Sequence, residues 1–492
     1  MWQGKRVYLI GAGLSGLAAA GWLLEQKALV CLNDKKAFEN FDEAKKRELL
    51  NLEAKGAILD LGKPCDPLSF KAEFVVASPG VPLDQAGIAE AKAKGIPVTN
   101  EIELGWQVSR ASIVAITGSN GKTTVTSLVG RMLEAAGFDP FVGGNIGTPF
   151  ILAAPGLNDR SWAVLELSSF QLEGVLSLKP KVAVFLNLTP DHLDWHKSFA
   201  NYEAAKWRIA RFQGPEDWLI LNYDDALLRA EGHKKIAGSA GAGAGQTQRG
   251  PRILWFSTRE KPAPGLWIDQ EGWVRFCPVS SVESGGADPD EKAAADSEGI
   301  KVMPAAEFAL PGRHNQENLL AALAACLVLD VPLEVLRQAA AGFKAVEHRM
   351  EVVGEWQGVL YVNDSKATNP DSAIKSLDAY ERPILLIAGG DGKNAPFKEV
   401  AEKIAEKAKL VVLIGKDGDK MKEALLEQGF DSIRMAATLE EAVDICCGLA
   451  LPGDLVLLAP ACASTDMFTN YAKRGEAFKA AVLRTQSAIR RC

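Results

Sequence analysis

The sequence lacks several features that would place it in other classes of protein. Its eight cysteines are scattered and include no C-x-x-C pair, which argues against a disulfide framework and favours free thiols in a reducing compartment. Its longest apolar run, Leu319 to Leu329, is shorter than the ~20 residues that cross a bilayer. The chain opens on a strand pattern and a glycine turn, which leaves no room for a signal peptide. We therefore expect a cytoplasmic protein without membrane insertion.

An excess of positive charge is absent as well. The formal net charge is -7, with 55 Lys and Arg against 62 Asp and Glu, and basic and acidic residues are mixed along the chain. Without a basic stripe, we expect no nucleic-acid partner. Anionic small-molecule ligands must then be bound by local structural features such as glycine loops and helix N-termini.

The sequence does contain a series of short runs rich in Val, Ile and Leu, mostly followed by glycine or polar turns and then helical patterns. Continuous apolar strands are typical of parallel sheets covered by helices on both faces, so we predict an α/β fold. The runs are RVYLIG, FVVASPG, IVAITG, WAVLELS, VAVFLNL, VLYVND, PILLIAGG, LVVLIG and LVLLAP.

A chain of 492 residues is too long for one core. Seams near Asn100 and Ala345 predict three domains, over residues 1–100, 101–345 and 346–492. Each should be a mainly parallel sheet with flanking helices, Rossmann-like in the first and third domains and like a P-loop ATPase in the second. Residues 232–300 contain two segments with few large apolar side chains, and we expect flexible surface loops there around a small β segment.

The first glycine motif is GAGLSG, Gly11 to Gly16, which follows an apolar strand and opens a helix. Asp34 ends the next strand, where an acid could take ribose hydroxyls. The motif fits NAD, FAD or another nucleotide, and a tight structural turn stays open. Ser78 to Gly80 could add a second glycine loop to the pocket or form a plain Pro-Gly turn.

The second glycine motif is TGSNGKTT, in which the first glycine comes two residues later than the full GxxxxGK[ST] pattern requires. It lies between a buried strand and a helix, where backbone N–H groups would cradle phosphates, Lys122 would neutralise them and Thr123 would reach Mg²⁺. A loop with a solvated lysine is the alternative. The predicted phosphate-binding residues are Gly118, Ser119, Asn120, Gly121, Lys122, Thr123 and Thr124.

Acidic residues and histidines follow two other strands. Glu166 ends an apolar run, where a carboxylate is costly unless it is paired or binds a metal. Asp191 and His192 end a later run. His192 and His196 have a zinc-like H-x-x-x-H spacing, but the HExxH motif with its glutamate base is missing. Both a metal site and a satisfied structural carboxylate remain open for Glu166.

Further polar groups follow strands in the last third of the chain. Asn315 and Asn318 begin a helix, where they could cap it or contact a base or ribose. VNDSKATNP, AGGDGK and APACASTDMF close three strands, and the carboxyl ends of parallel strands form the usual ligand crevice. Lys206, by contrast, has the pattern of a lysine on a helix surface.

The order of these motifs resembles the Mur ligases, the ATP-dependent amide-bond ligases of peptidoglycan precursor synthesis. TGSNGKTT, GGNIG, ELSSFQL, DH, AAK, HNxxN, HR and GGDGK occur in family order over nearly the whole chain, and the family's phosphate loop is this shortened form. NDSKATN and APACAS are similar to the members that add D-glutamate. The resemblance implies a monomer that joins D-glutamate to UDP-N-acetylmuramoyl-L-alanine through an acyl phosphate, with ATP and two Mg²⁺ ions.

The resemblance also implies roles for individual residues. For the UDP substrate these are Leu14, Ser15, Asp34 and Gly80 at the nucleotide and Asn145 and Gln171 at the muramoyl portion. For ATP they are Asn315, Asn318, Arg349 and Asp364 besides the phosphate loop. The catalytic set is Lys122, Glu166, His192 and Lys206, and the metal set is Thr123, Glu166, His192 and Lys206, the last in carbamylated form. For D-glutamate they are Thr368, Lys393, Ser464 and Tyr471.

The sequence departs from the family at a few places. Lys35 and Lys36 follow Asp34 where relatives often have Thr and Arg, and Thr465 and Tyr471 replace a Leu and a Phe. These changes affect the expected contacts with the UDP phosphates and with glutamate. Two other classes of function remain: an NAD-linked oxidoreductase, which would leave GKTT and Glu166 without a role, and a non-catalytic nucleotide-binding regulator.

Overall fold

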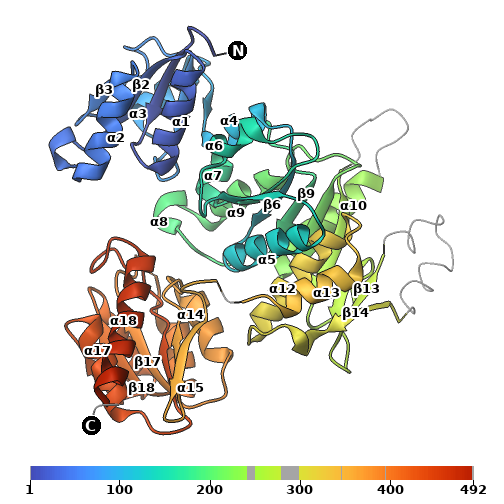
Figure 1. The fold of residues 1–492 in the computed structure, drawn as a ribbon, viewed down its shortest axis with the longest axis vertical. Coiled ribbons are helices and arrows are strands. Elements are labelled where there is room, and N and C mark those ends of the chain that lie inside the picture. The colour runs from blue at the N-terminus through green and yellow to red at the C-terminus, as the bar shows by residue number, and fades with distance from the viewer. Residues whose placement is uncertain (1, 241–249, 279–297, 345, 394, 490–492) are drawn as a thin grey trace. The chain divides into compact units, whose positions relative to one another are not determined.

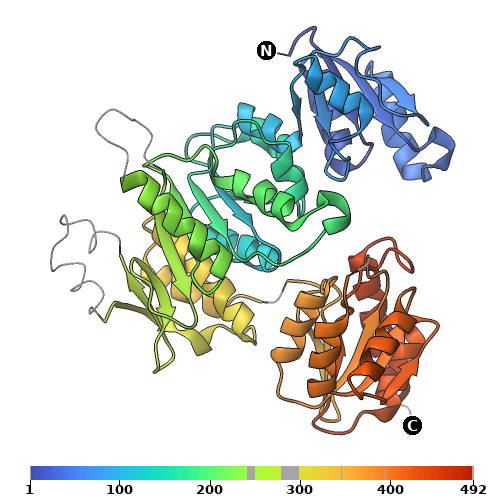
Figure 2. The ribbon, with the colours of Figure 1, turned by 180° about the vertical axis from the view of Figure 1, so that it is seen from behind.

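The computed structural model describes residues 2–240, 250–278, 298–344, 346–393 and 395–489. It contains three sheets, each flanked by helices (Figure 1, and from behind in Figure 2). The predicted α/β class with mainly parallel sheets is confirmed. The chain forms two compact units, one made of Met1–Met303 with Leu320–Ala339 and the other of Pro304–Leu319 with Ala340–Cys492.

The first sheet has five parallel strands in the order β3-β2-β1-β4-β5. Side chains of β1 alternate between two buried clusters, with Val7 and Leu9 in one and Tyr8 and Ile10 in the other, so both faces of the sheet are covered. The elements are β1 (Arg6–Ile10), α1 (Leu14–Glu25), β2 (Leu29–Asp34), α2 (Glu43–Ala54), β3 (Ile58–Leu61), β4 (Phe74–Ala77), α3 (Ala86–Ala93) and β5 (Val98–Thr99).

The second sheet has nine strands in the order β14-β13-β12-β11-β10-β9-β6-β8-β7. The neighbouring strands from β7 to β12 are parallel, and β13 runs antiparallel to β12. The strands are β6 (Ser112–Thr117), β7 (Pro140–Gly144), β8 (Trp162–Glu166), β9 (Val182–Phe185), β10 (Trp218–Asn222), β11 (Arg252–Ser257), β12 (Gly265–Ile268), β13 (Trp273–Cys277) and β14 (Ile300–Pro304). The helices are α4 (Glu101–Val108), α5 (Lys122–Ala135), α6 (Phe150–Ala153), α7 (Ser169–Glu173), α8 (Leu193–His196), α9 (Phe199–Trp207), α10 (Ala226–Ala240), α12 (Arg313–Leu327) and α13 (Leu333–Ala341).

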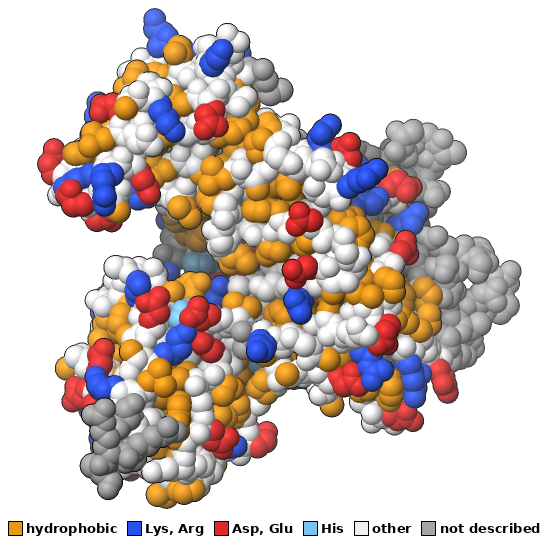
Figure 3. All heavy atoms as spheres, viewed as in Figure 1, with side chains coloured by type: hydrophobic (Ala, Val, Ile, Leu, Met, Phe, Trp, Pro, Cys, Tyr) orange, Lys and Arg blue, Asp and Glu red, His pale blue; other side chains and the backbone are white. Residues whose placement is uncertain are grey.

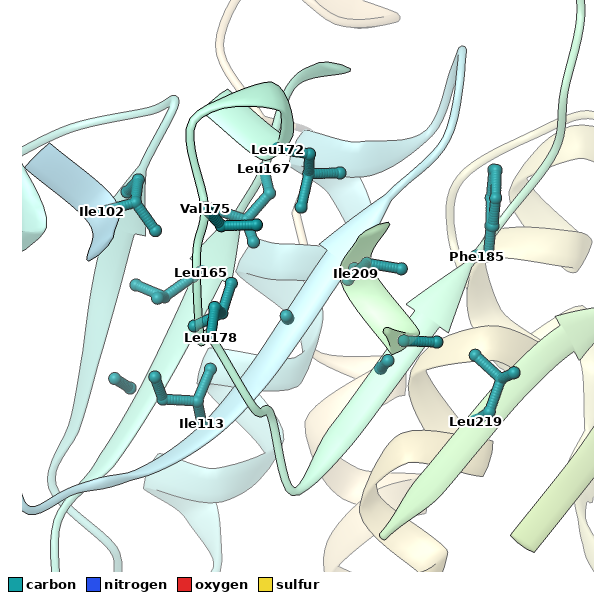
Figure 4. Close-up of a cluster of buried hydrophobic side chains, with 14 of the residues drawn as sticks. Ile102, Ile113, Leu165, Leu167, Leu172, Val175, Leu178, Phe185, Ile209 and Leu219 are labelled. Atoms are coloured by element: carbon teal, nitrogen blue, oxygen red, sulfur yellow. The ribbon is translucent and has the colours of Figure 1, made fainter. Parts of the chain in front are cut away.

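A large buried cluster covers one face of this second sheet (Figure 4). Ile113 of β6, Leu165 of β8 and Phe185 of β9 are fully buried in it together with Leu172 of α7. Each such side chain contributes ~1.5–3 kcal/mol through burial. The cluster therefore fixes the strands whose carboxyl ends carry the predicted phosphate site.

The small β segment predicted within residues 232–300 is present as β11, β12 and β13, which extend the second sheet beyond β10. The loops predicted on either side of it fall largely on residues 241–249 and 279–297, which lie outside the described residues. The described part of this region thus consists of the end of α10 and of strands that continue the central sheet.

The third sheet has six strands in the order β15-β16-β20-β17-β18-β19. All its pairs are parallel except β15 with β16, a hairpin closed by Gln357 and Gly358. Separate buried clusters cover its two faces. The elements are β15 (Glu351–Trp356), β16 (Val359–Asn363), α14 (Pro370–Asp378), β17 (Ile384–Gly389), α15 (Lys398–Lys407), β18 (Ala408–Ile414), α16 (Gly418–Glu427), β19 (Ile433–Met435), α17 (Leu439–Leu449), β20 (Leu455–Leu458) and α18 (Tyr471–Ile489).

The charged side chains on the surface are mixed, as the sequence suggested. On the face seen in Figure 3, Lys and Arg side chains are interspersed with Asp and Glu, and no extended area carries one sign. Within the described part of the chain, no helix combines the length and the apolar character that crossing a bilayer requires.

Candidate active site

The predicted phosphate loop joins the end of β6 to the start of α5. Gly121 precedes the helix with a φ of +85°, a left-handed conformation that glycine adopts without strain. Thr123 and Thr124 in the first turn of α5 are buried. Among the described residues, the buried Thr124 Oγ1 has no hydrogen-bond partner. The loop therefore has the geometry of an anion cradle at a helix N-terminus.

Asn187, which follows β9, holds this loop in place. Its backbone carbonyl accepts from Ser119 N at 3.0 Å, and its side-chain oxygen accepts from Asn120 N at 2.8 Å. Its amide group in turn donates to Asn120 O at 3.1 Å. Sequence reasoning missed Asn187, although its place directly after an apolar strand next to β6 was an available signal.

Two lysines converge on the phosphate loop. Lys122 Nζ donates to the carbonyl oxygens of Gly118 and Ser119, both at 2.7 Å. Lys206 Nζ, from α9, donates to the same Gly118 oxygen at 2.7 Å. Two cationic groups so close repel each other, which favours a neutral form for one of them.

Lys206 is the more perturbed of the two. Its side chain is 1% exposed, so the helix-surface position suggested by the sequence pattern is wrong. Burial and the nearby Lys122 lower its pKa well below the usual value, while Asp191 and Glu166 act in the opposite direction. The lowered pKa favours the neutral amine, which is the nucleophilic form of lysine.

Glu166 ends β8 and is 1% exposed. Its Oε1 accepts from Asn145 Nδ2 at 2.8 Å, and its backbone carbonyl accepts from Asn145 N at 2.8 Å. The preceding strand β7 ends in Gly144, where a Cβ would lie 2.5 Å from Glu166 O. Only glycine allows the two strand ends to approach this closely, so Gly144 helps to place the carboxylate.

His192 adopts a left-handed conformation with φ of +53°, and its ring lies 4.8 Å from that of Phe170. Its Nε2 is 3.6 Å from Asp191 Oδ2. His196 is turned to other partners, Ser169 Oγ at 2.9 Å and Glu173 Oε1 at 3.3 Å. Among the described residues, neither histidine belongs to a group of three His, Cys, Asp or Glu side chains close enough to share a metal.

The first glycine loop lies between β1 and α1. Asp34 Oδ2 accepts from Ala12 N at 2.8 Å and Oδ1 accepts from Lys36 N at 2.9 Å, so this carboxylate braces the loop. Ser78 Oγ donates to Gly11 O at 2.9 Å and ties the second glycine loop to the first.

The predicted UDP contacts lie on these two loops. Leu14 is 63% exposed at the start of α1, and Ser15 follows it. Gly80 has a φ of +94°. The structure thus brings the two loops together, as the sequence suggested.

Gln171, predicted to touch the muramoyl portion, is buried in α7. Its Oε1 accepts from Ser168 N and Ser168 Oγ, each at 3.0 Å, in a capping box at the start of the helix. Asn145 lies exposed on the strand end beside Glu166. Contact of either residue with a substrate remains a prediction.

The other predicted ATP residues lie in the second unit. Asn315 and Asn318 are buried and bonded to each other at 3.1 Å, and Asn315 Nδ2 donates to Pro311 O at 2.7 Å. Burial raises the pKa of the Asp364 carboxyl, while the nearby Arg349 guanidinium lowers it. Arg349 Nε is buried and has no hydrogen-bond partner among the described residues. A buried donor without an acceptor is costly, and contact of Arg349 with ATP stays a prediction.

The predicted D-glutamate residues lie on the loops that follow the parallel strands of the third sheet. Thr368 follows β16 and Lys393 follows β17, where Lys393 is exposed with φ of +48°. Ser464 follows β20 and is 3% exposed. Tyr471 begins α18, and its ring lies 5.0 Å from Lys366 Nζ.

Three family models match the chain. The Mur ligase MurD-like N-terminal domain matches residues 5–100, the Mur ligase middle domain matches residues 116–253, and the Mur ligase glutamate ligase domain matches residues 348–462. The first and second matches cover the two glycine loops, and the third covers the loops after β16, β17 and the start of the loop after β20.

Curated relatives match over nearly their full length. The UDP-N-acetylmuramoylalanine-D-glutamate ligase of Pelotomaculum thermopropionicum is 42% identical, with 97% of each chain covered. The protein of the same name from Koribacter versatilis is 40% identical, also with 97% of each chain covered.

Solved structures with the same fold are more distant in sequence. The UDP-N-acetylmuramate-alanine ligase MurC from Thermotoga maritima is 17% identical with a TM-score of 0.58, covering 98% of this chain and 99% of its own. MurF from Acinetobacter baumannii is 18% identical with a TM-score of 0.57, covering 97% and 93%. These matches extend the shared fold over the whole chain, and the family models and curated relatives agree with them in sequence. The chain belongs to the Mur ligase family.

Proposed function

We propose that this protein joins D-glutamate to UDP-N-acetylmuramoyl-L-alanine, using ATP and releasing ADP and phosphate, in peptidoglycan precursor synthesis. Mur ligases are ATP-dependent enzymes that form amide bonds, and the curated relatives carry the name of the D-glutamate ligase. The observation that carries the proposal is the convergence of Lys122 and Lys206 on one phosphate loop, with the buried Glu166 near enough to act on the pKa of Lys206. An NAD-linked oxidoreductase would leave that arrangement without a role.

The chemistry begins with a carboxylate that an amine does not attack. Transfer of the ATP γ-phosphoryl group to the alanyl carboxylate gives an acyl phosphate, and attack by the D-glutamate amine then forms the amide and expels phosphate. Several anionic oxygens must approach one another in the first step. In this chain, Lys122 and the N–H groups of the phosphate loop donate hydrogen bonds to these oxygens and so offset the repulsion between the oxygens.

The residues beside the loop fit a hard divalent cation. Glu166 offers a buried carboxylate, Thr123 a hydroxyl and His192 an imidazole, and oxygen ligands suit Mg²⁺. Bound Mg²⁺ would neutralise phosphate charge and orient the transferred group. We propose two ions, held by Thr123, Glu166, His192 and Lys206.

Lys206 fits this set only after a change of charge, because an ammonium would repel the cation. In the neutral amine, the Nζ lone pair can add to the carbon of CO₂: the N–C bond forms, one C=O π bond opens so that its electron pair becomes an oxyanion, and Nζ releases one proton to solvent. The product is a carbamate, an anionic oxygen ligand. The lowered pKa of Lys206 supports this modification, since it makes the neutral amine available.

The substrates bind to the other predicted residues. The uridine diphosphate is bound by Leu14, Ser15, Asp34 and Gly80. The muramoyl portion is bound by Asn145 and Gln171. Asn315, Asn318, Arg349 and Asp364 contribute to ATP binding. D-glutamate is bound by Thr368, Lys393, Ser464 and Tyr471. We propose domains over residues 1–100, 101–345 and 346–492, each with one sheet, in a monomeric cytoplasmic enzyme.

An amino-acid-dependent phosphate-release assay tests the function. With ATP and Mg²⁺, release should require UDP-N-acetylmuramoyl-L-alanine and D-glutamate together, and either alone should give background. A stronger response to L-lysine or meso-diaminopimelate than to D-glutamate would reject the substrate assignment. ATP hydrolysis without amide formation would instead favour a nucleotide-binding regulator.

A further inference from the structure

Arg474, in the first turn of α18, is the largest fully buried side chain among the described residues and is 1% exposed. Among the described residues, no carboxylate oxygen lies within 4.0 Å of its guanidinium nitrogens, so Arg474 forms no ion pair there. A buried guanidinium without a paired carboxylate is costly, so its position requires other compensating contacts.

Those contacts come from two loops that follow different strands. Arg474 Nε donates to Ser365 Oγ at 3.0 Å and Nη2 donates to Ser365 O at 2.8 Å, in the loop after β16. Nη1 donates to Cys462 O at 3.1 Å, in the loop after β20. Burial lowers the pKa of Arg474 to about 10, so the group stays charged at neutral pH and its hydrogen bonds are charge-assisted.

The same network reaches the start of α18. Ser365 Oγ donates to Tyr471 O at 2.7 Å, which ties the loop after β16 to the first residue of the helix. Asp391 and Ala463 exchange two backbone hydrogen bonds, of 3.0 and 2.9 Å, which tie the loop after β17 to the loop after β20. All three loops and the helix are thus connected, and Arg474 bridges two of the loops directly.

Each anchored point is close in sequence to a residue assigned to D-glutamate. Thr368 follows Ser365 in the same loop, and Ser464 follows Cys462. Lys393 follows Asp391 in the same way, and Tyr471 precedes Arg474 on α18. A shift of the anchored points would therefore move side chains that must converge on one small ligand.

We propose that Arg474 is a positioning residue for the amino-acid substrate: it fixes the Ser365 and Cys462 loops against the start of α18. The inference rests on the proposed function, because D-glutamate is the ligand assigned to these loops. Arg474 itself acts through the backbone and hydroxyl groups that it holds. Its removal leaves three buried acceptors, Ser365 Oγ, Ser365 O and Cys462 O, without their donor, which destabilises the two loops.

Two substitutions separate the shape of the side chain from its charge. Arg474→Met keeps an unbranched apolar stem and removes the donors. Arg474→Lys keeps the charge, but one ammonium cannot reproduce the planar fork that spans both loops. The matched control is Arg484→Met on the same helix, because Arg484 is 55% exposed and pairs with Asp444 at the surface.

Steady-state kinetics should show a selective effect. Arg474→Met should raise the KM for D-glutamate at least tenfold and change the KM for UDP-N-acetylmuramoyl-L-alanine less than twofold, since residues assigned to that substrate belong to the first unit. Arg474→Lys should recover part of the loss, and Arg484→Met should match the wild type.

An unchanged KM for D-glutamate, or an equal loss for all substrates in a folded protein, overturns the inference. If Arg474→Met does not melt cooperatively, Ser365→Ala replaces it under the same criterion, because this variant loses one acceptor and the tie to Tyr471 but keeps the guanidinium. Failure of the proposed function is distinct, since the wild type itself would then show no phosphate release dependent on D-glutamate.

Discussion

Lys206 is buried beside Lys122, and both the burial and the neighbouring lysine favour a form of its side chain without positive charge. Lys206→Ala should therefore lose most activity and regain part of it with acetate, which can occupy the vacated ligand position. Lys206→Arg should stay inactive, because guanidinium remains charged and cannot form the carbamate. Turnover with and without acetate is the measurement, and Lys234→Ala, 74% exposed on α10, is the control.

A readout independent of activity follows from the same chemistry. Wild-type protein equilibrated with ¹³C-bicarbonate should show a carbamate carbon by NMR that is missing in Lys206→Arg. Full activity of Lys206→Arg, or the same carbamate signal in both proteins, would show that Lys206 is not modified.

Lys122 and Glu166 should matter through the charge that develops during phosphoryl transfer. Removing one preorganised charge-stabilising group costs roughly 2.7–4 kcal/mol, so Lys122→Ala and Glu166→Ala should each lower kcat by about 10²- to 10³-fold or more. Arg131→Ala, on the exposed side of α5, should leave kcat unchanged. Near-normal turnover of either active-site variant would remove that residue from the mechanism.

The residue types of the site could be predicted from the sequence, whereas their partners could not. Lys122, Thr123 and Glu166 follow apolar runs, so their place at strand ends can be inferred from local pattern. The role of Asp34 as a brace for the glycine loop depends on which backbone N–H groups it meets, and the network around Arg474 joins residues about a hundred positions apart. Such contacts are set by tertiary packing, which local pattern does not contain.

At the scale of elements, each predicted apolar run became a strand because continuous Val, Ile and Leu side chains can be buried on both faces of a parallel sheet. The antiparallel hairpin β15-β16 was not predicted, since its first strand, EVVGEW, is only partly buried and lacks a continuous apolar run. The continuation of the second sheet through β11, β12 and β13 was also underestimated, because weakly apolar segments surround those strands.

The ends of β7 and β8 give a test at this scale. Gly144→Ala would introduce a Cβ 2.5 Å from Glu166 O at a φ of +98°, so it should lower the melting temperature and displace the carboxylate. Gly137→Ala, at a φ of +87° in open space, carries only the left-handed strain of about 1–2 kcal/mol. Comparing their melting temperatures and kcat separates the clash from the strain. Equal effects of the two substitutions would mean that close strand approach at Gly144 does not place Glu166.

For the whole molecule, separate cores make each sheet a stable support for its loops. The clusters on the first, second and third sheets are distinct, and the ligand loops lie at strand ends rather than within those cores. Glu101, the first residue of α4, is a buried carboxyl in the segment that leads from the first sheet to the second. Its Oε1 accepts from Ile151 N at 2.6 Å, and its buried Oε2 has no partner among the described residues.

Glu101 should make the stability of the molecule depend on pH. Burial raises its pKa from 4.5 to about 7, while the backbone N–H groups of Ile151 and Phe150 act in the opposite direction. At pH values below the pKa of Glu101 in the unfolded chain, the carboxyl is protonated in both the folded and the unfolded state, so its contribution to the free energy of unfolding is fully present. As the pH rises towards 7, the unfolded chain releases this proton more readily than the folded protein does, so the free energy of unfolding falls.

The Glu101→Gln variant tests this, because glutamine cannot titrate. Its free energy of unfolding relative to the wild type should rise between pH 5 and pH 8 by on the order of 2–3 kcal/mol. Melting temperatures at the two pH values measure this, with Glu43→Gln on the surface of α2 as the control. An equal difference at both pH values would mean that Glu101 is ionised in the folded protein despite its burial.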